Sequence, residues 1–170
     1  MIELQQDPLS WTPERGRQPI LVAVDFSQFS EKAFLWAVGT AKKLGLPLVV
    51  LHVVHDSGSS VGDYETPRRH HVHLIRIEEA ASEMLSNFLR RMRRRHPEVS
   101  GDLEPLLVTG LPTTRIVEVA KRIGASMIVV GSSGRTGLHR MWQGSNAEKI
   151  ARISPIPVTI VKDSPARATT

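Results

Sequence analysis

The stretch from Gly131 to Ser145, GSSGRTGLHRMWQGS, holds residue types that can bind phosphate, and it directly follows the apolar run ASMIVV. Glycine lets backbone N–H groups approach a ligand without an intervening Cβ, and successive N–H groups form an anion-binding concavity. A helical pattern begins at Ser145, and a helix N-terminus adds partial positive charge and free donors. The pattern favours a phosphate cradle over an ordinary surface loop. Its candidate members are Gly131, Gly134, Gly144 and Ser145, with Ser133, Arg135 and Thr136 as further donors.

Two other features of this stretch limit the interpretation. Ser145 and Glu148 fit the S-x-x-E capping box, so Ser145 has a structural role available that is compatible with phosphate binding. The chain contains neither a G-x-x-x-x-G-K-[ST] loop nor a G-x-G-x-x-G after its first apolar run. The sequence therefore does not support a P-loop or a dinucleotide-binding loop.

The elements that must position this loop alternate between apolar runs and amphipathic segments. Strands are expected at 20–24, 46–54, 102–110, 125–131 and 155–163, and helices at 29–45, from 74 to before Pro97, at 113–124 and at 145–153. Ser30 is the expected N-cap of the first helix and Gly45 its C-terminal stop. Alternating strands and helices predict an α/β fold with a doubly wound five-stranded parallel sheet. In the order 3-2-1-4-5, the first and fourth strands open a ligand crevice at Asp25 and Gly131.

Length and composition indicate one domain. The chain has 170 residues, of which 41% are hydrophobic and 23% charged, and it has no cysteine for a disulfide or a thiolate site. We expect an extended N-terminal arm over 1–19, the domain over 20–163 and a C-terminal tail over 164–170. No signal sequence and no apolar run of about 20 residues is present, so we expect a cytoplasmic protein without a membrane partner.

Two charged groups invite other functions. His70, His71 and His73 lie near His55 and Asp56, but H-H-x-H is not a helical i, i+4 ligand pair, and we expect no metal site. The formal charge of +5 is concentrated in the run 90–96. Met92 continues the apolar stripe of that helix, which leaves the arginines on the solvent side, and no aromatic residues interleave with them for base stacking. A solvated helix end is favoured over a nucleic-acid site.

The spacing Gly131-x2-Gly134-x9-Gly144-Ser145 resembles the G-x2-G-x9-G-[ST] motif of the ATP-binding branch of the universal stress proteins. The resemblance extends over about 20–162 and includes AVDFS (23–27), LHVV (51–54) and IVVG (128–131). It implies an adenine nucleotide alpha-hydrolase-like, Rossmann-like fold that binds ATP with Mg²⁺. Ser126, Ser133 and Asn146 depart from the residues common in the family, and Ser133 and Asn146 border the phosphate site.

The resemblance also implies roles for individual residues. Asp25 lies beside the adenosine and Val53 meets the adenine through its backbone, although Asp25 also has a structural alternative, bonding backbone groups at the end of its strand. The glycines and Ser145 hold the ribose and phosphates. The full set of expected binding residues is Ala23, Val24, Asp25, Val53, Val130, Gly131, Ser133, Gly134, Arg135, Gly144, Ser145 and Asn146.

The favoured function is a nucleotide-binding regulatory or stress-response protein with slow or no ATP turnover, because no residue at the phosphates matches a kinase or P-loop arrangement. An ATP-hydrolysing or autophosphorylating enzyme is the first alternative, and a nucleic-acid-binding module acting through Arg90–Arg95 is the second. The resemblance further implies a homodimer through the last strand, 156–161. Proline at Thr159 is expected to weaken that dimer if the Thr159 N–H faces the partner.

Overall fold

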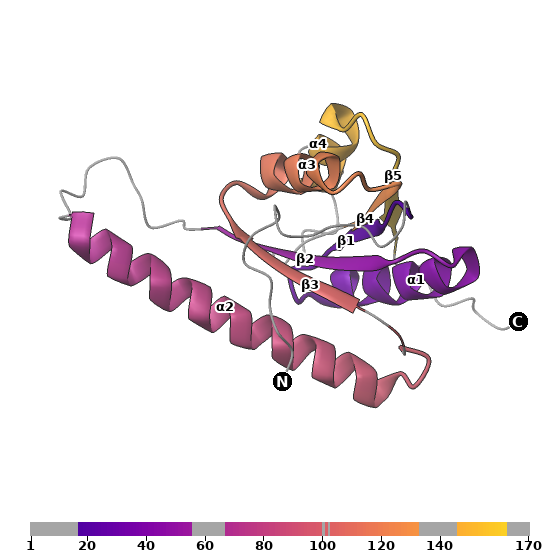
Figure 1. The fold of residues 1–170 in the computed structure, drawn as a ribbon, viewed down its shortest axis with the longest axis horizontal. Coiled ribbons are helices and arrows are strands. Elements are labelled where there is room, and N and C mark those ends of the chain that lie inside the picture. Colours follow the sequence, from indigo (N-terminus) through magenta and orange to yellow (C-terminus); the bar gives the residue numbers. More distant parts are fainter. Residues whose placement is uncertain (1–16, 56–66, 100, 102, 133–145, 163–170) are drawn as a thin grey trace, which may run out of the picture.

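The structure is a computed structural model that describes residues 17–55, 67–99, 101, 103–132 and 146–162, with only the backbone described over 67–74. Five strands alternate with four helices in this part of the chain (Figure 1). In chain order they are β1 (Ile20–Ala23), α1 (Gln28–Leu44), β2 (Leu48–Val54), α2 (Pro67–Arg95), β3 (Leu103–Thr109), α3 (Pro112–Arg122), β4 (Met127–Gly131), α4 (Asn146–Ile153) and β5 (Val158–Val161).

The five strands form one sheet in the order β3-β2-β1-β4-β5, and every neighbouring pair is parallel. The α/β fold class and the strand order expected from the sequence are therefore confirmed. The last strand is shorter than the expected 155–163, because Pro155 and Pro157 have no N–H to contribute to a ladder and pairing begins at Val158.

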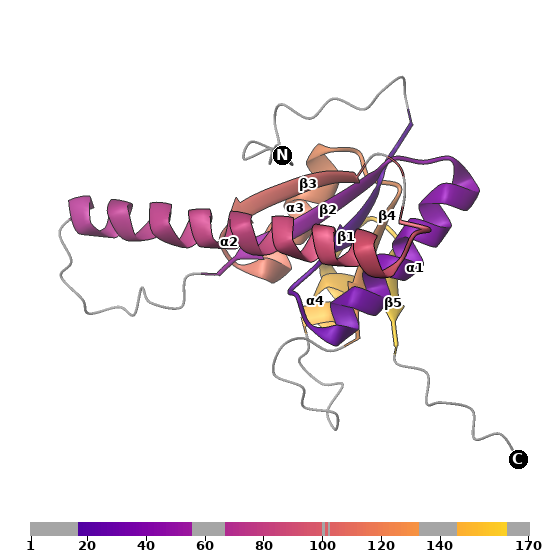
Figure 2. The ribbon, with the colours of Figure 1, turned by 90° about the horizontal axis from the view of Figure 1, so that it is seen from below.

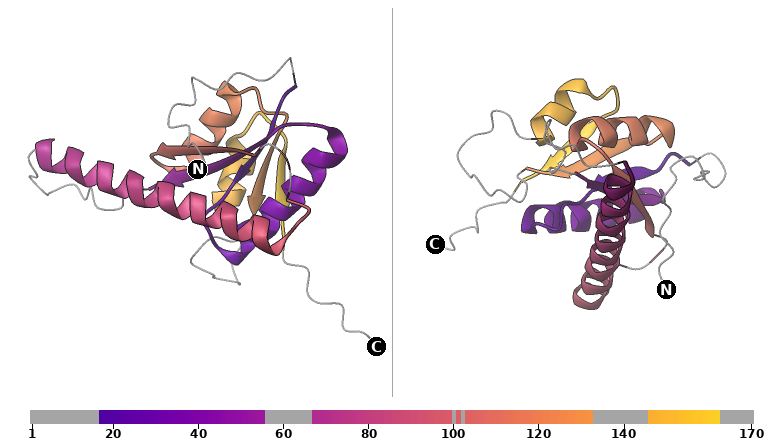
Figure 3. Two further views of the ribbon diagram at one scale, coloured as in Figure 1. Left: turned by 60° about the horizontal axis from the view of Figure 1, so that its bottom comes forward. Right: turned by 90° about the vertical axis from the view of Figure 1, so that its left-hand side faces the viewer.

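Helices cover both faces of the sheet, α1 and α2 on one and α3 and α4 on the other (Figure 1 and the right panel of Figure 3). Successive strand residues point to opposite faces, so each buried strand supplies both cores. In β1, for example, Ile20 and Val22 belong to the core under α1 and α2, whereas Leu21 belongs to the core under α3 and α4. Near-continuous apolar strands are thus the sequence mark of this three-layer arrangement.

Helix α1 begins and ends at residues with distinct backbone requirements. Its N-cap is Ser27, whose side-chain oxygen accepts from the Ser30 backbone N–H, so the expectation of Ser30 as N-cap was wrong. Ser30 is instead buried in the first turn, and its hydroxyl donates to the Ser27 carbonyl at 3.0 Å. At the other end Gly45 adopts φ 64° and donates to the Ala41 carbonyl, which confirms the expected glycine stop.

Helix α2 is longer than the sheet that it covers. It begins beyond the carboxyl ends of the strands and runs back beneath them (Figures 1 and 2). Leu85, Phe88, Leu89 and Met92 are buried against the sheet, and the arginines of the last turns are exposed. The expected division between the buried Met92 stripe and the solvated arginines is therefore confirmed.

Candidate functional site

The carboxyl ends of β1 and β4 meet at one edge of the sheet. The two strands pair in register from Ile20 opposite Met127 to Val22 opposite Val129, so both chains leave the sheet at the same level. Strand order reverses between these neighbours, because β1 leads to α1 on one face and α3 precedes β4 on the other. Such a switch point is where open α/β sheets bind ligands. Asp25 and Gly131 therefore lie at the switch point between β1 and β4, where the sequence predicted a ligand crevice.

The carboxylate of Asp25 is held by the residue that caps α1. One carboxylate oxygen of Asp25 accepts from the Ser27 backbone N–H at 3.1 Å and from the Ser27 hydroxyl at 2.6 Å. The Ser27 hydroxyl in turn accepts from the Ser30 N–H at 3.2 Å. The structural role considered for Asp25 is thus present. It also orients the carboxylate at the crevice, because a side chain fixed by two bonds has few other rotamers available.

Phe26, between Asp25 and Ser27, has an unusual backbone conformation. Its φ is +65°, a left-handed value that costs a bulky non-glycine residue free energy. Aromatic contacts hold it there: the Phe26 ring centroid lies 4.3 Å from that of His52 and 5.7 Å from that of Phe88 on α2. Packing from β2 and α2 therefore determines the course of the chain on either side of Asp25.

His52 on β2 contacts the segment that carries Asp25. Its Nδ1 lies 2.7 Å from the Val24 carbonyl oxygen. A carbonyl oxygen only accepts, so Nδ1 carries the proton and donates this bond. His52 thus ties β2 to the residue before Asp25 and stacks on the residue after it. The supporting roles of Phe26, Ser27 and His52 were not predicted from the sequence. These polar and aromatic residues stand close to Asp25 and Val53 in the chain, and that position was the signal that could have indicated them.

The backbone N–H and C=O groups of Val53 face the β1 side of β2. The pairing of β2 with β1 ends at Ala23 opposite Leu51, where the Val24 N–H donates to the Leu51 carbonyl. Alternate residues of a strand bond to alternate neighbours, so the amide groups of Val53 face the β1 side, as those of Leu51 do. Val54 bonds to the other side, its carbonyl accepting from the Gly110 N–H. Since the β1 pairing ends at Ala23, the Val53 amide lies just beyond the end of that ladder, on the β1 side of β2.

Gly131 is required by packing. A Cβ on Gly131 would lie 2.9 Å from the backbone carbon and oxygen of Phe29 and 3.1 Å from the Phe29 Cβ. The first turn of α1 therefore presses against the end of β4, and only glycine leaves room for it. The sequence predicted that a glycine here lets a ligand approach the backbone. The contact with Phe29 gives a second reason for glycine at position 131, and it does not involve a ligand.

The remaining expected residues fall into three groups. Val24 and Val130 are buried and Ala23 is partly buried. Asn146 is exposed at the first position of α4. The rest of the expected cradle lies outside the described residues: Ser133, Gly134, Arg135, Thr136, Gly144 and Ser145.

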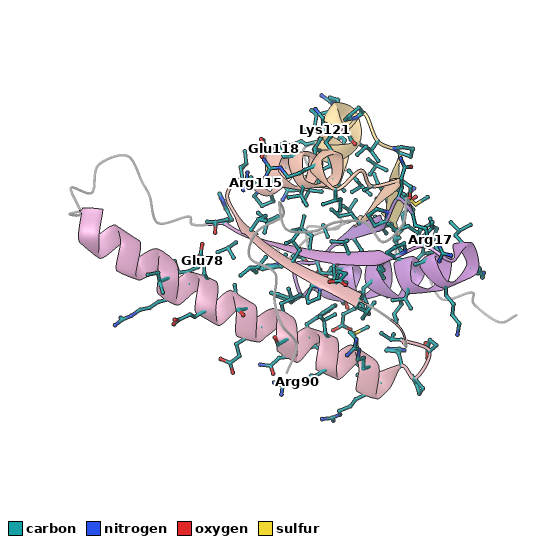
Figure 4. All side chains as sticks on the ribbon, viewed as in Figure 1. Arg17, Glu78, Arg90, Arg115, Glu118 and Lys121 are labelled. Atoms are coloured by element: carbon teal, nitrogen blue, oxygen red, sulfur yellow. The ribbon has the colours of Figure 1, made fainter. Side chains whose placement is uncertain are left out.

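A second polar group lies at the carboxyl end of β3. The Thr109 hydroxyl donates to a Glu78 carboxylate oxygen at 2.7 Å, which connects α2 to this edge (Figure 4). On the other side, the stem of Arg115 lies against Gly110, and its guanidinium contacts Glu118 at 2.9 Å. These contacts connect α2 and α3 to the carboxyl end of β3.

Within the described residues, no three or more His, Cys, Asp or Glu side chains gather in a way that could hold a metal ion. Of the expected histidine group only His55 has a described side chain, and it is exposed. None of the described helices is long and apolar enough to cross a membrane.

Comparison with known proteins identifies the family. The profile of the Universal stress protein family matches residues 16–162. Universal stress protein YxiE of Bacillus subtilis is 36% identical over 147 residues, covering 84% of this chain and 97% of its own length. The structure of universal stress protein UspA from Lactobacillus plantarum is 25% identical with a TM-score of 0.68, covering 86% of this chain and 99% of that chain.

A further similar structure carries a ligand. The universal stress protein from Archaeoglobus fulgidus, determined in complex with dAMP, is 26% identical with a TM-score of 0.55 and covers 85% of this chain and 98% of that chain. The family profile spans most of the chain, and the fold agrees with these structures. The chain belongs to the universal stress protein family.

Proposed function

We propose that this universal stress protein binds ATP with Mg²⁺ at the carboxyl ends of β1 and β4 and acts as a nucleotide-binding regulatory protein. The observation that carries the proposal is the juxtaposition of Asp25, fixed by Ser27, with the inward-facing amide of Val53 and the end of β4 at Gly131. A carboxylate that accepts from ribose hydroxyls and a backbone amide that pairs with a base edge together suit an adenosine.

The phosphates then extend toward the glycine stretch and the start of α4. The spacing from Gly131 to Ser145 supports this direction, as does the exposed N-terminus of α4 at Asn146. The related Archaeoglobus fulgidus protein in complex with dAMP supports an adenine nucleotide as the ligand class. Backbone donors bind ground state and transition state alike, so we expect slow or no turnover of ATP.

Calorimetry tests the proposal directly. Ligand-free wild-type protein is titrated with ATP and Mg²⁺, and the same titration is repeated with Asp25→Ala and with Asp25→Asn. We expect wild-type binding, a loss of roughly tenfold or more for Asp25→Ala, and an intermediate loss for Asp25→Asn, which keeps one acceptor oxygen. No heat with folded wild-type protein at millimolar nucleotide, confirmed by equilibrium dialysis, would refute ATP binding.

We further propose a homodimer in which two β5 strands pair. β5 lies at the edge of the sheet, and its four residues are all partly exposed. Among the described residues no strand pairs with its outer side, so that side can pair with a second copy of the chain. The Pro157 and Val161 carbonyls accept from Ile128 and Ser132, and by alternation Thr159 also bonds to β4. The Thr159 N–H therefore faces β4 and not a second copy of the chain. Proline at Thr159 is thus not expected to test the dimer, because that prediction required an outward-facing N–H.

By the same alternation the N–H groups of Val158 and Ile160 face outward, and Ile160 is the one farther from Pro157. Ile160→Pro should weaken the dimer while it leaves the β4–β5 ladder intact, and Ile160→Val is the matched control that retains the N–H. Light scattering across a concentration series measures the effect. A monomeric wild type at micromolar concentration, or equal dimer strength in the two variants, contradicts pairing through β5.

A further inference from the structure

The last turns of α2 carry a solvent-open hollow whose lining includes the side chains of three arginines. It has a volume of about 450 Å³ and is lined by Asn87, Arg90, Arg91 and Arg94. These residues stand at i, i+3, i+4 and i+7, which places them on one face of the helix. The buried residues Phe88, Leu89 and Met92 lie on the opposite, sheet-facing side. Arg90 projects away from the body of the protein (Figure 4).

Few carboxylates neutralise this hollow. Glu31 of α1 is shared between Arg91, at 2.6 Å, and Arg95, at 3.7 Å. Within the described part of the chain, Arg90 contacts only the amide oxygen of Asn87, and Arg94 has no carboxylate within ion-pair distance. The guanidinium groups of Arg90 and Arg94 therefore keep most of their N–H donors available.

One guanidinium is held in place beside these two. Arg91 lies over the Phe88 ring, with its guanidinium carbon 5.5 Å from the ring centroid, and it is anchored at one nitrogen by Glu31. Stacking and one ion pair restrict the Arg91 guanidinium and leave its other N–H groups without a carboxylate partner within the described residues. The hollow thus joins a pre-oriented guanidinium to two that adapt to a ligand, and Asn87 adds an amide.

The extent of the positive charge defines the ligand. Toward the N-terminus the same helical row continues from Asn87 to Glu83 and Glu79, which are both exposed and acidic. The three lining arginines therefore lie within about one helical turn, a rise of about 6 Å. A nucleic-acid backbone that followed the helix would meet the carboxylates of Glu83 and Glu79 before it reached the next exposed arginine, Arg76. A compact anion with closely spaced phosphate groups would meet only cations.

We propose that the hollow formed by Asn87, Arg90, Arg91 and Arg94 is a binding site for a compact diphosphate-type anion, separate from the nucleotide crevice. Guanidinium groups bind phosphate oxygens bidentately, and several around one anion supply both charge and geometry. The anion is either free or the phosphorylated headgroup of a larger molecule, since both present the same group to the arginines.

Adjacent residues provide a matched pair of variants. Arg93 and Arg94 are both exposed and lie on the same turn, and either change to glutamine removes one positive charge, but only Arg94 lines the hollow. The probe is inorganic pyrophosphate, and calorimetry measures its binding to each protein at low salt, where screening is weak. We expect Arg94→Gln to lower the affinity roughly five- to tenfold and Arg93→Gln to lower it less than about twofold.

Other outcomes overturn the site. Equal losses in the two variants mean a diffuse positive field, and no loss in either means that pyrophosphate binds elsewhere, including the glycine stretch. Absence of binding to the folded wild type also refutes it. Asn87→Asp, which places a carboxylate in the hollow without removing an arginine, should reduce affinity as well; unchanged affinity contradicts the proposed location.

The source of the anion is resolved by two further probes. Phosphatidylcholine vesicles that contain phosphatidylinositol bisphosphate are compared with free pyrophosphate in the same variants. Binding of the vesicles that depends on Arg94 and not on Arg93 supports the headgroup form, and pyrophosphate binding with the same dependence supports the free form. Duplex DNA is the competing macromolecule: if it binds more tightly than both and responds equally to the two variants, the helix end is a general nucleic-acid contact and the proposal fails.

Discussion

Replacement of Gly131 by alanine separates the packing role of this glycine from a role in ligand binding. The added Cβ would lie 2.9 Å from the Phe29 carbonyl carbon and oxygen and 3.1 Å from the Phe29 Cβ. Two of these atoms belong to the backbone of α1, so relief requires movement of the helix relative to β4. Overpacking of this kind typically costs about 1–3 kcal/mol. We expect Gly131→Ala to lower the free energy of unfolding by that amount.

Gly39 provides a control in α1, the same helix that a Cβ at position 131 would clash with. It is exposed in the middle of α1, and a Cβ there would have no neighbour within 4 Å. Glycine inside a helix is about 0.5–1 kcal/mol less favourable than alanine. Gly39→Ala should therefore stabilise the protein, and the two changes should move stability in opposite directions.

Urea unfolding followed by circular dichroism measures both variants, and thermal unfolding gives a second reading at about 2–4 °C per kcal/mol for a chain of this size. A Gly131→Ala protein as stable as the wild type would refute the contact with Phe29. If such a protein had also lost nucleotide binding, Gly131 would serve the ligand alone. Reduced stability with nucleotide affinity retained would assign the glycine to packing.

Three other changes test single contacts. Ser27→Ala should lower the free energy of unfolding by about 1 kcal/mol through loss of the α1 cap, and it should weaken ATP binding because Asp25 loses its hydroxyl partner; denaturation and calorimetry measure the two effects. Gly45→Ala should cost about 1 kcal/mol in urea unfolding, because φ 64° is strained for alanine, and an unchanged midpoint would contradict that conformation. Glu31→Gln should cost less than about 1 kcal/mol, because its arginine partners are largely exposed, and the cost should vanish at high salt in the same unfolding assay.

Within the described residues, the sequence by itself determined the architecture. Continuous apolar runs such as 20–24 and 46–54 indicate strands buried on both faces, and the amphipathic segments between them indicate crossover helices. Right-handed crossovers then leave few possible strand orders, and the expected order 3-2-1-4-5 was correct. The buried stripe through Met92 and the stop at Gly45 were also correct, because helical periodicity and left-handed backbone are local properties.

Tertiary structure decided what depends on contacts between distant segments. Ser27 rather than Ser30 caps α1 because the chain turns sharply at Phe26, and that turn is held by His52 and Phe88 from other elements. The close approach of Phe29 to Gly131, which are about a hundred residues apart along the chain, appears only when α1 packs on β4. Local patterns specify which face of an element is buried. The atoms that meet across that face depend on how the elements are packed, and at this crevice packing sets the orientation of Asp25.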